Sequence, residues 1–153
     1  MPNLDPEFHD AASCLHREHE ELMAKLDQLE SALEQMVCYT EVLTDMATAN
    51  QAAASGKWMA EWLPRHYARE ETTVLEMIAR MSPELAAFAR EMKRQHGEMR
   101  LRLESFRDHI AHISERRDLE TAVAELKREG KDLTRMMRLH IAMEEKKFSG
   151  MEN

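Results

Sequence analysis

The sequence predicts an all-α protein, an up-down-up-down antiparallel four-helix bundle, and three observations support this fold class. Glycine and proline together number only eight of 153 residues, and valine and isoleucine also number eight. Leu, Met, Ala, Glu, Lys and Arg dominate instead, and these residues favour helices over strands. Apolar residues also recur at alternating steps of three and four, which is the helical period. Together these features exclude a β-sandwich, a β-barrel and a parallel α/β sheet.

Three sites in the chain carry the signals that begin a helix. Asp5 followed by Pro6 is typical of a helix start, because an acidic N-cap precedes a proline at the first helical position. Ser82 followed by Pro83 repeats this signature and predicts a turn at residues 81–83. The polar segment 114–118 follows an apolar stripe and predicts another turn.

The turn between the first two helices, and the second helix itself, carry weaker signals. We expect the first turn near residues 41–45, and a loop through residues 52–56 is the alternative. Pro64 falls inside the second helix, where it removes one backbone hydrogen bond and predicts a disturbance. No internal repeat or linker divides the chain, so residues 1–153 are expected to form a single domain.

Charge and cysteine content exclude several classes of protein. The net charge of −8 argues against binding to nucleic acid. No apolar run is long enough for a membrane span, and the first residues do not resemble an export signal, so no membrane partner is expected. If Cys14 and Cys38 lie on one helix, they are too far apart for a disulfide, which favours two reduced thiols and a cytoplasmic location.

Polar residues interrupt the apolar stripes at positions that packing reserves for Leu or Met. Burial of an unpartnered imidazole or carboxylate costs several kcal/mol, so a common reason is needed for all of them. Histidine and glutamate are suitable ligands for a first-row transition metal. The six candidate metal ligands are His19, His66, Glu70, His96, His140 and Glu144.

Spacing predicts that these six side chains converge. His66 and Glu70 are four residues apart, as are His140 and Glu144, so each pair lies on one helical face. Residues on antiparallel helices share one height when the turn lies midway between them. The midpoints between successive histidines of the set fall near 42, 81 and 118, close to the three expected turns.

The remaining histidines and two further glutamates are interpreted differently. The histidines lie off the stripes or far from the expected layer, and we interpret them as surface or flanking residues: His9, His16 with Glu20, His109 and His112. Glu71 and Glu145 follow the paired carboxylates. They are interpreted as solvated charges or as acceptors for imidazole N–H groups.

Four segments carry these residues in the order H…HxxxE…H…HxxxE: REHEELMAKL, RHYAREETTVL, RQHGEMRLRL and LHIAMEEKKF. In this pattern the chain resembles the hemerythrin-like, HHE cation-binding family. The resemblance implies a four-helix bundle with two non-haem iron ions, joined by an oxo or hydroxo bridge. By the same resemblance His19 and His66 hold one iron, His96 and His140 hold the other, and Glu70 and Glu144 bridge both.

The ligand pattern departs from that of the oxygen-carrying hemerythrins. Those proteins have a second histidine four residues after the first on the third helix, where this chain has Arg100. An arginine cannot be a metal ligand. The set of four histidines and two glutamates is similar to that of the di-iron domain of the repair-of-iron-centres proteins, which are linked to nitric oxide and oxidative stress. An open position is then expected on both irons.

The expected function is that of a cytoplasmic di-iron protein that binds NO or reacts with oxygen species in nitrosative or oxidative stress. A role in the repair of iron centres is included in this hypothesis. The alternative is a non-catalytic protein that binds or senses O2, NO or iron. A site holding zinc or manganese also remains open at this point. The sequence does not decide whether the protein is an enzyme.

Overall fold

The computed structural model describes residues 5–36, 38–39, 42–43 and 46–152. In this part of the chain the helices are α1 (Pro6–Gln35), α2 (Met46–Thr72), α3 (Val74–Ala79), α4 (Pro83–Ala111), the 3-10 helix η1 (Ile113–Glu115) and α5 (Leu119–Glu152). The strands are β1 (Cys38–Tyr39) and β2 (Val42–Leu43). No helix among the described residues has both the length and the apolar character that crossing a membrane requires.

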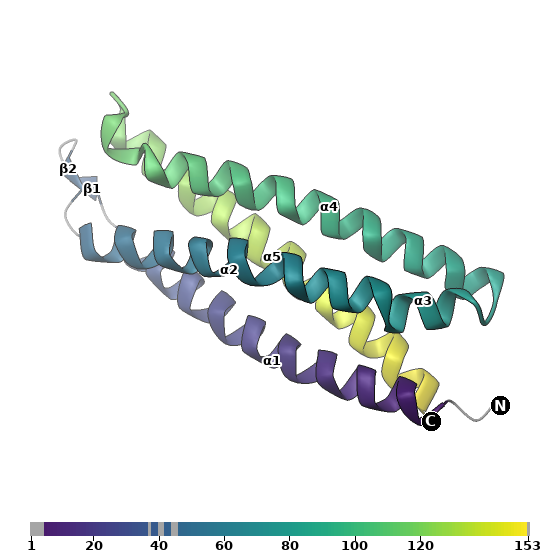
Figure 1. Cartoon of the computed structure of the whole chain (residues 1–153). Helices are drawn as coiled ribbons and strands as arrows, with labels where there is room; N and C mark the ends of the chain where they lie inside the picture. Colours follow the sequence, from purple (N-terminus) through teal and green to yellow (C-terminus); the bar gives the residue numbers. More distant parts are fainter. Residues whose placement is uncertain (1–4, 37, 40–41, 44–45, 153) are drawn as a thin grey trace.

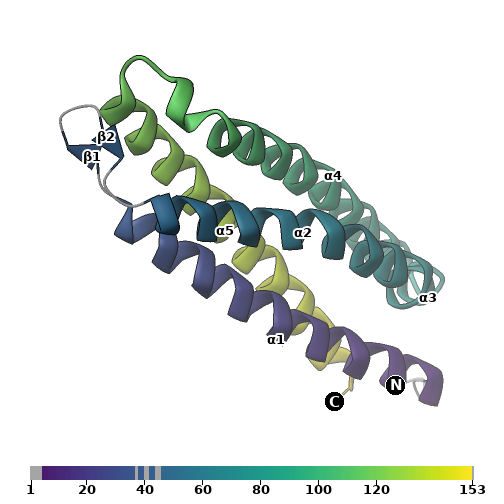
Figure 2. The same cartoon turned by 60° about the vertical axis from the view of Figure 1, so that its left-hand side comes forward.

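The long helices form an antiparallel bundle, which confirms the predicted fold class (Figure 1). The bundle has four columns, and each is one length of helix: α1, α2 continued by α3, α4, and α5. Helix α1 packs against α2 and α5, and α4 packs against the same two helices on the other side. Figure 2 shows the same arrangement after rotation, with α5 behind α1 and α2. The first turn of α1 and the last turn of α5 lie at the same end of the molecule.

Side-chain caps begin three of the helices where the sequence predicts them. A side-chain oxygen in each case accepts a hydrogen bond from a backbone N–H of the first turn, which would otherwise lack a partner. The pairs are Asp5 with Glu7 at 3.2 Å, Ser82 with Leu85 at 3.1 Å, and Asp118 with Thr121 at 3.1 Å. The turns at residues 81–83 and 114–118 are therefore confirmed.

The connection between α1 and α2 contains a short antiparallel ladder. Cys38 pairs with Leu43 and Tyr39 pairs with Val42. This ladder is an addition to the all-helical expectation. Much of the turn expected at residues 41–45 lies outside the described residues. The alternative loop through residues 52–56 is wrong, because these residues lie inside α2.

The second column is interrupted at Thr73 rather than at Pro64. Helix α2 continues through Pro64, whereas Thr73 has φ −115° and ψ −93° and separates α2 from α3. The hydroxyl groups of Thr72 and Thr73 donate to the carbonyl oxygens of Ala68 and Arg69, at 2.7 and 2.5 Å. Such bonds compete with the helical backbone pattern and bend a helix. The disturbance therefore comes from two adjacent threonines after Glu70.

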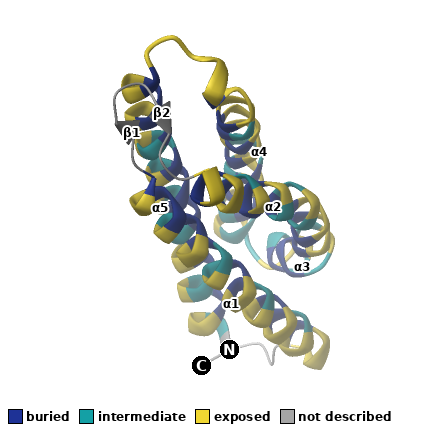
Figure 3. Ribbon diagram, turned by 90° about the vertical axis from the view of Figure 1, so that its left-hand side faces the viewer, coloured by how far each residue is buried: buried dark blue, intermediate teal, exposed yellow. Residues whose placement is uncertain are grey.

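Buried residues face the inside of the bundle (Figure 3). They form two apolar clusters. The larger cluster lies towards β1 and β2 and includes Leu26, Met59, Phe106 and Leu126. The smaller cluster lies at the end where α1 begins and includes Phe8, Leu75, Met92 and Phe148. A layer of polar side chains separates the two clusters along the bundle.

Candidate metal centre

The six candidate ligands lie in this polar layer, and all four columns of the bundle contribute. Helix α1 carries His19, α2 carries His66 and Glu70, α4 carries His96, and α5 carries His140 and Glu144. None of the six residues is more than 4 % exposed. The structure therefore brings together, inside the protein, all of the side chains that the sequence places on the apolar stripes.

One half of the layer joins α1 and α2. The Nε2 atoms of His19 and His66 lie 3.6 and 3.3 Å from Oε2 of Glu70. The two imidazole rings are 5.0 Å apart between centroids. These three side chains each offer one atom to a group in which all ligand atoms lie within 4.8 Å of one another. This separation allows them to contact one ion.

The other half joins α4 and α5 through the second oxygen of the same glutamate. Nε2 of His96 lies 3.1 Å from Oε1 of Glu70, and Nε2 of His140 lies 2.9 Å from Oε1 of Glu144. These four residues form the second group of ligand atoms within 4.8 Å. Oε1 of Glu144 also lies 3.5 Å from Nε2 of His19. Both carboxylates therefore stand between the two pairs of histidines.

The carboxylate oxygens of the layer lack hydrogen-bond donors. Both oxygens of Glu70 and both oxygens of Glu144 are buried without a hydrogen-bond partner among the described residues, as is Nε2 of His19. The neighbouring imidazole nitrogens are close but not in hydrogen-bond geometry. A buried, unsatisfied carboxylate costs several kcal/mol unless a cation compensates it. The donor set therefore fits a metal ion held by nitrogen and carboxylate ligands.

The outer nitrogens of three of these histidines have defined partners. Nδ1 of His19 donates to Oε1 of Glu145 at 2.8 Å, and Nδ1 of His140 donates to Oε1 of Gln95 at 2.7 Å. Nδ1 of His66 donates to Glu18. Because each acceptor is an oxygen without a proton, Nδ1 carries a hydrogen in each of the three rings. Nε2 of each ring thus faces the middle of the layer, and it is the nitrogen that can bind a metal.

Charge inside the layer shifts several pKa values. Burial alone raises the pKa of Glu70, but the imidazoles of His19, His66 and His96 outweigh burial and hold this pKa well below its ordinary value. Burial also lowers the pKa of His19, yet contacts with Glu145 and Glu70 raise it to about 9. Burial and the nearby His96 lower the pKa of His140 to about 3. The pKa values of His19 and His140 are therefore shifted in opposite directions when no metal compensates the carboxylates.

Aromatic rings flank one histidine of each half. The Trp62 ring stacks on His66 with centroids 4.8 Å apart, and the Tyr67 ring stacks on His96 at 3.9 Å. Trp58 in turn stacks on Trp62 at 5.0 Å. Such stacking restricts the orientation of an imidazole ring.

The sequence analysis missed these rings and two of the Nδ1 acceptors. Trp62 stands four residues before His66 on the same helical face, which is a usable signal. Glu18 and Gln95 each directly precede a histidine of the set. Adjacent residues on a helix do not face each other, so this position does not predict a contact with the layer. Glu145 accepts a hydrogen bond from His19, which agrees with its interpretation as an acceptor for an imidazole N–H group. Oε1 of Glu71 lies 3.5 Å from Nδ1 of His96, within ion-pair distance.

The histidines assigned to the surface lie outside the layer. His9, His16, His109 and His112 are all exposed. His16 forms ion pairs with Glu20 at 3.3 Å and with Glu145 at 3.0 Å. It therefore contacts the partner of His19 without reaching the layer itself. His109 pairs with Glu129 near the larger apolar cluster.

Comparison with known proteins agrees with the geometry. The sequence model of the hemerythrin HHE cation binding domain matches residues 15–151. This range contains all six residues of the buried layer and nearly the whole bundle. Neither the curated proteins nor the solved structures gave a significant match to the chain. The chain belongs to the hemerythrin family of HHE cation-binding domains.

Proposed function

We propose that the buried layer binds two metal ions and that these ions are iron. His19 and His66 would hold one ion, His96 and His140 the other, and Glu70 and Glu144 would bridge them. The observation that supports this proposal is the pair of fully buried carboxylates whose four oxygens have no hydrogen-bond donor among the described residues. Two cations would compensate both carboxylates and use every inward Nε2 lone pair.

Bound iron would supply a redox-active centre that takes up small diatomic molecules. The residues of this chain prepare the site for it. Glu145, Glu18 and Gln95 keep a proton on the outer nitrogen of three histidines, so that Nε2 of each ring faces the layer. Without metal, Nε2 of His140 lies 3.1 Å from Nε2 of His96 and shares a hydrogen bond with it. The apolar clusters on both sides exclude water from the layer and strengthen its electrostatic interactions.

The proposed physiological ligand is NO or an oxygen species, and the proposed setting is nitrosative or oxidative stress in the cytoplasm, including the repair of iron centres. Four histidines and two bridging carboxylates leave fewer protein ligands than a centre with a fifth histidine. Arg100, at the position of that histidine, is exposed and lies outside the layer. The exposed, free thiol of Cys14 favours a reducing compartment.

Metal analysis of matched variants tests the ligand set. We expect Glu70→Ala to lose at least one iron ion per chain, because this carboxylate faces both pairs of histidines. His109→Ala should retain the full iron content, since His109 lies outside the layer. Equal iron content in the two variants would contradict the assignment. A wild-type protein that contains zinc or manganese would keep the ligands but overturn the iron proposal.

Rapid mixing of the reduced, iron-loaded protein with oxygen tests the chemistry. We expect oxidation without a long-lived oxygen adduct, and we expect the reduced protein to bind NO. Absorbance in the visible range follows both reactions. A persistent band that appears with oxygen and disappears under vacuum would instead identify an oxygen carrier.

A further inference from the structure

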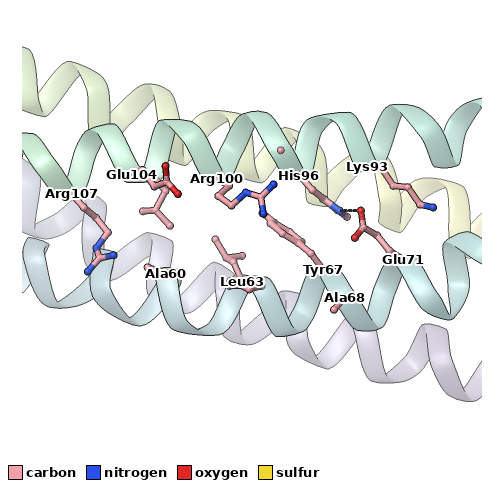
Figure 4. A pocket seen from close by; sticks show the side chains of 13 residues that line it. Ala60, Leu63, Tyr67, Ala68, Glu71, Lys93, His96, Arg100, Glu104 and Arg107 are labelled. Atoms are coloured by element: carbon pink, nitrogen blue, oxygen red, sulfur yellow. Dashed lines mark ion pairs between the residues drawn. The ribbon is translucent and has the colours of Figure 1, made fainter.

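A groove between α2 and α4 lies beside the polar layer (Figure 4). Its volume is about 350 Å³, within the range of small-molecule sites. Small residues keep it open: Ala60 and Ala68 lie on the α2 side, and Gly97 lies on the α4 side. A Cβ atom built on Gly97 would meet no atom within 4 Å. The groove is therefore an open space between two packed helices.

The floor of the groove is apolar. Leu63 and Leu103 are buried there, and the Tyr67 ring lies on His96. Tyr67 is only 8 % exposed, and among the described residues its hydroxyl has one weak partner, the sulfur of Met99 at 3.9 Å. A phenol hydroxyl that is buried usually has a stronger acceptor. This hydroxyl is thus available to donate to a ligand.

The rim of the groove carries an excess of positive charge in a protein of net charge −8. Lys93, Arg100 and Arg107 stand seven residues apart along one face of α4. None of these three cations has an ion pair among the described residues. Arg94 and Arg102, on the same helix but outside the groove, bind the carboxylates of Glu91 and Glu98.

The two carboxylates at the rim do not neutralise Arg100. Glu71 faces Nδ1 of His96 at 3.5 Å, and neither Glu71 nor Glu104 comes within 4 Å of the Arg100 guanidinium. Figure 4 shows the Arg100 side chain extending from α4 towards the Tyr67 ring. Arg100 and Tyr67 therefore line the same part of the groove.

We propose that this groove binds a small organic carboxylate, whose carboxylate group pairs with Arg100 and whose apolar part lies on Leu63 and Leu103. The planar guanidinium matches a carboxylate with two parallel hydrogen bonds. A seven-residue spacing on a helix puts Lys93 and Arg107 about 10 Å from Arg100, too far to share one phosphate group. One central arginine over an apolar floor therefore fits a carboxylate better than a phosphate. This binding requires no metal, so it is independent of the proposed function.

Calorimetric titration of the whole chain with benzoate tests the proposal. We expect benzoate to bind both the metal-free and the metal-loaded protein, and we expect the neutral analogue benzamide to bind at least about tenfold more weakly. Arg100→Gln should weaken benzoate binding by about tenfold or more. Arg102→Gln, on the same helix but outside the groove, should leave it unchanged. Gly97→Leu should block the groove without removing a charge.

The outcomes separate this proposal from the metal proposal. Iron content is measured on each sample, so loss of metal and loss of benzoate binding are read independently. Absence of benzoate binding at about 10 mM would overturn the groove site. Binding that needs metal, or that is the same in Arg100→Gln, would also overturn it. Equal affinity for inorganic phosphate would overturn the assignment to a carboxylate.

Discussion

The two ends of the bundle are built from the same four columns, but they differ in the core that each contains. Towards β1 and β2, uninterrupted helices enclose the larger apolar cluster. At the other end, the second column breaks at Thr73 and the smaller cluster depends on α3 and on the last turns of α5. The polar layer lies between them. The two proposed metal ions, held by side chains from all four columns, would join the smaller end to the larger one.

This difference shows where stability resides in the fold. Buried apolar area is the main favourable contribution to folding, so the larger cluster should carry most of the free energy of unfolding. The layer contributes little by itself, because its carboxylates are buried without donors. Without metal, the smaller end is therefore expected to open at a lower free energy than the larger end.

Removal of an aromatic ring from each cluster should give the largest contrast. Phe106 is fully buried in the larger cluster, and its ring contacts the positions of Gly56 and Gly130. We expect Phe106→Ala to lower the free energy of unfolding by about 4 kcal/mol. Phe148→Ala, in the smaller cluster, should cost about 3 kcal/mol, at the lower end of the usual range, because the end of α5 can relax around the cavity. Urea denaturation measures both; equal losses would contradict the comparison.

Metal removal is expected to have the next largest effect. At a free metal concentration of about 100 times Kd, binding adds about 2.7 kcal/mol to the free energy of unfolding. A chelator should remove this contribution, and hydrogen exchange should speed up more in α3 and at the end of α5 than around Phe106. The Glu70→Ala variant should show a smaller response. A uniform change in exchange along the chain would show that the layer does not join the two ends.

Two glycines, one packed in the larger cluster and one beside the layer, should respond in opposite directions. A Cβ on Gly130 would come within 2.3 Å of a methyl carbon of Leu33, so Gly130→Ala should cost about 1–3 kcal/mol. Gly97 lies in a helix beside open space, and Gly97→Ala should stabilise the protein by about 0.5–1 kcal/mol. Thermal unfolding of both variants checks the signs. Stabilisation by Gly130→Ala would show that the larger cluster is loosely packed.

Helix caps should give the smallest effect, and it should be equal at the two ends. Asp118 caps α5 near the larger cluster, and Ser82 caps α4 near the smaller one. Each substitution by alanine should cost about 1 kcal/mol, because one backbone N–H loses its acceptor. Denaturation midpoints of Asp118→Ala and Ser82→Ala provide the measurement. A much larger loss for Ser82→Ala would indicate that the smaller end is held mainly by its turn.

Most of the fold was predictable because its signals are local. The caps at Asp5, Ser82 and Asp118 act within one helical turn, and the apolar period of each helix is visible in the printed sequence. The convergence of the six polar residues was also predictable, because a constant helical rise converts sequence distance into height. The place of the break in the second column was not predicted. Helix α2 continues through Pro64, and the column is interrupted at Thr73, where two threonine hydroxyl groups bond to backbone carbonyl groups.

The partners around the layer were not predictable in the same way. Gln95 reaches His140, and Glu18 reaches His66, across from one column to the next. These contacts depend on how the columns rotate and pack against one another, which no local pattern encodes. The same is true of the groove beside Arg100, whose space arises where small residues on α2 meet Gly97 on α4.

Local chemistry in the chain thus decides the helices, their order and the height of each polar side chain, because caps and periodicity act over a few residues. Tertiary packing decides which nitrogen of each histidine faces inward, which carboxylate remains without a donor, and where a groove stays open. These properties arise from distances of 3–4 Å between atoms on different columns, and such distances exist only after the four columns have packed together.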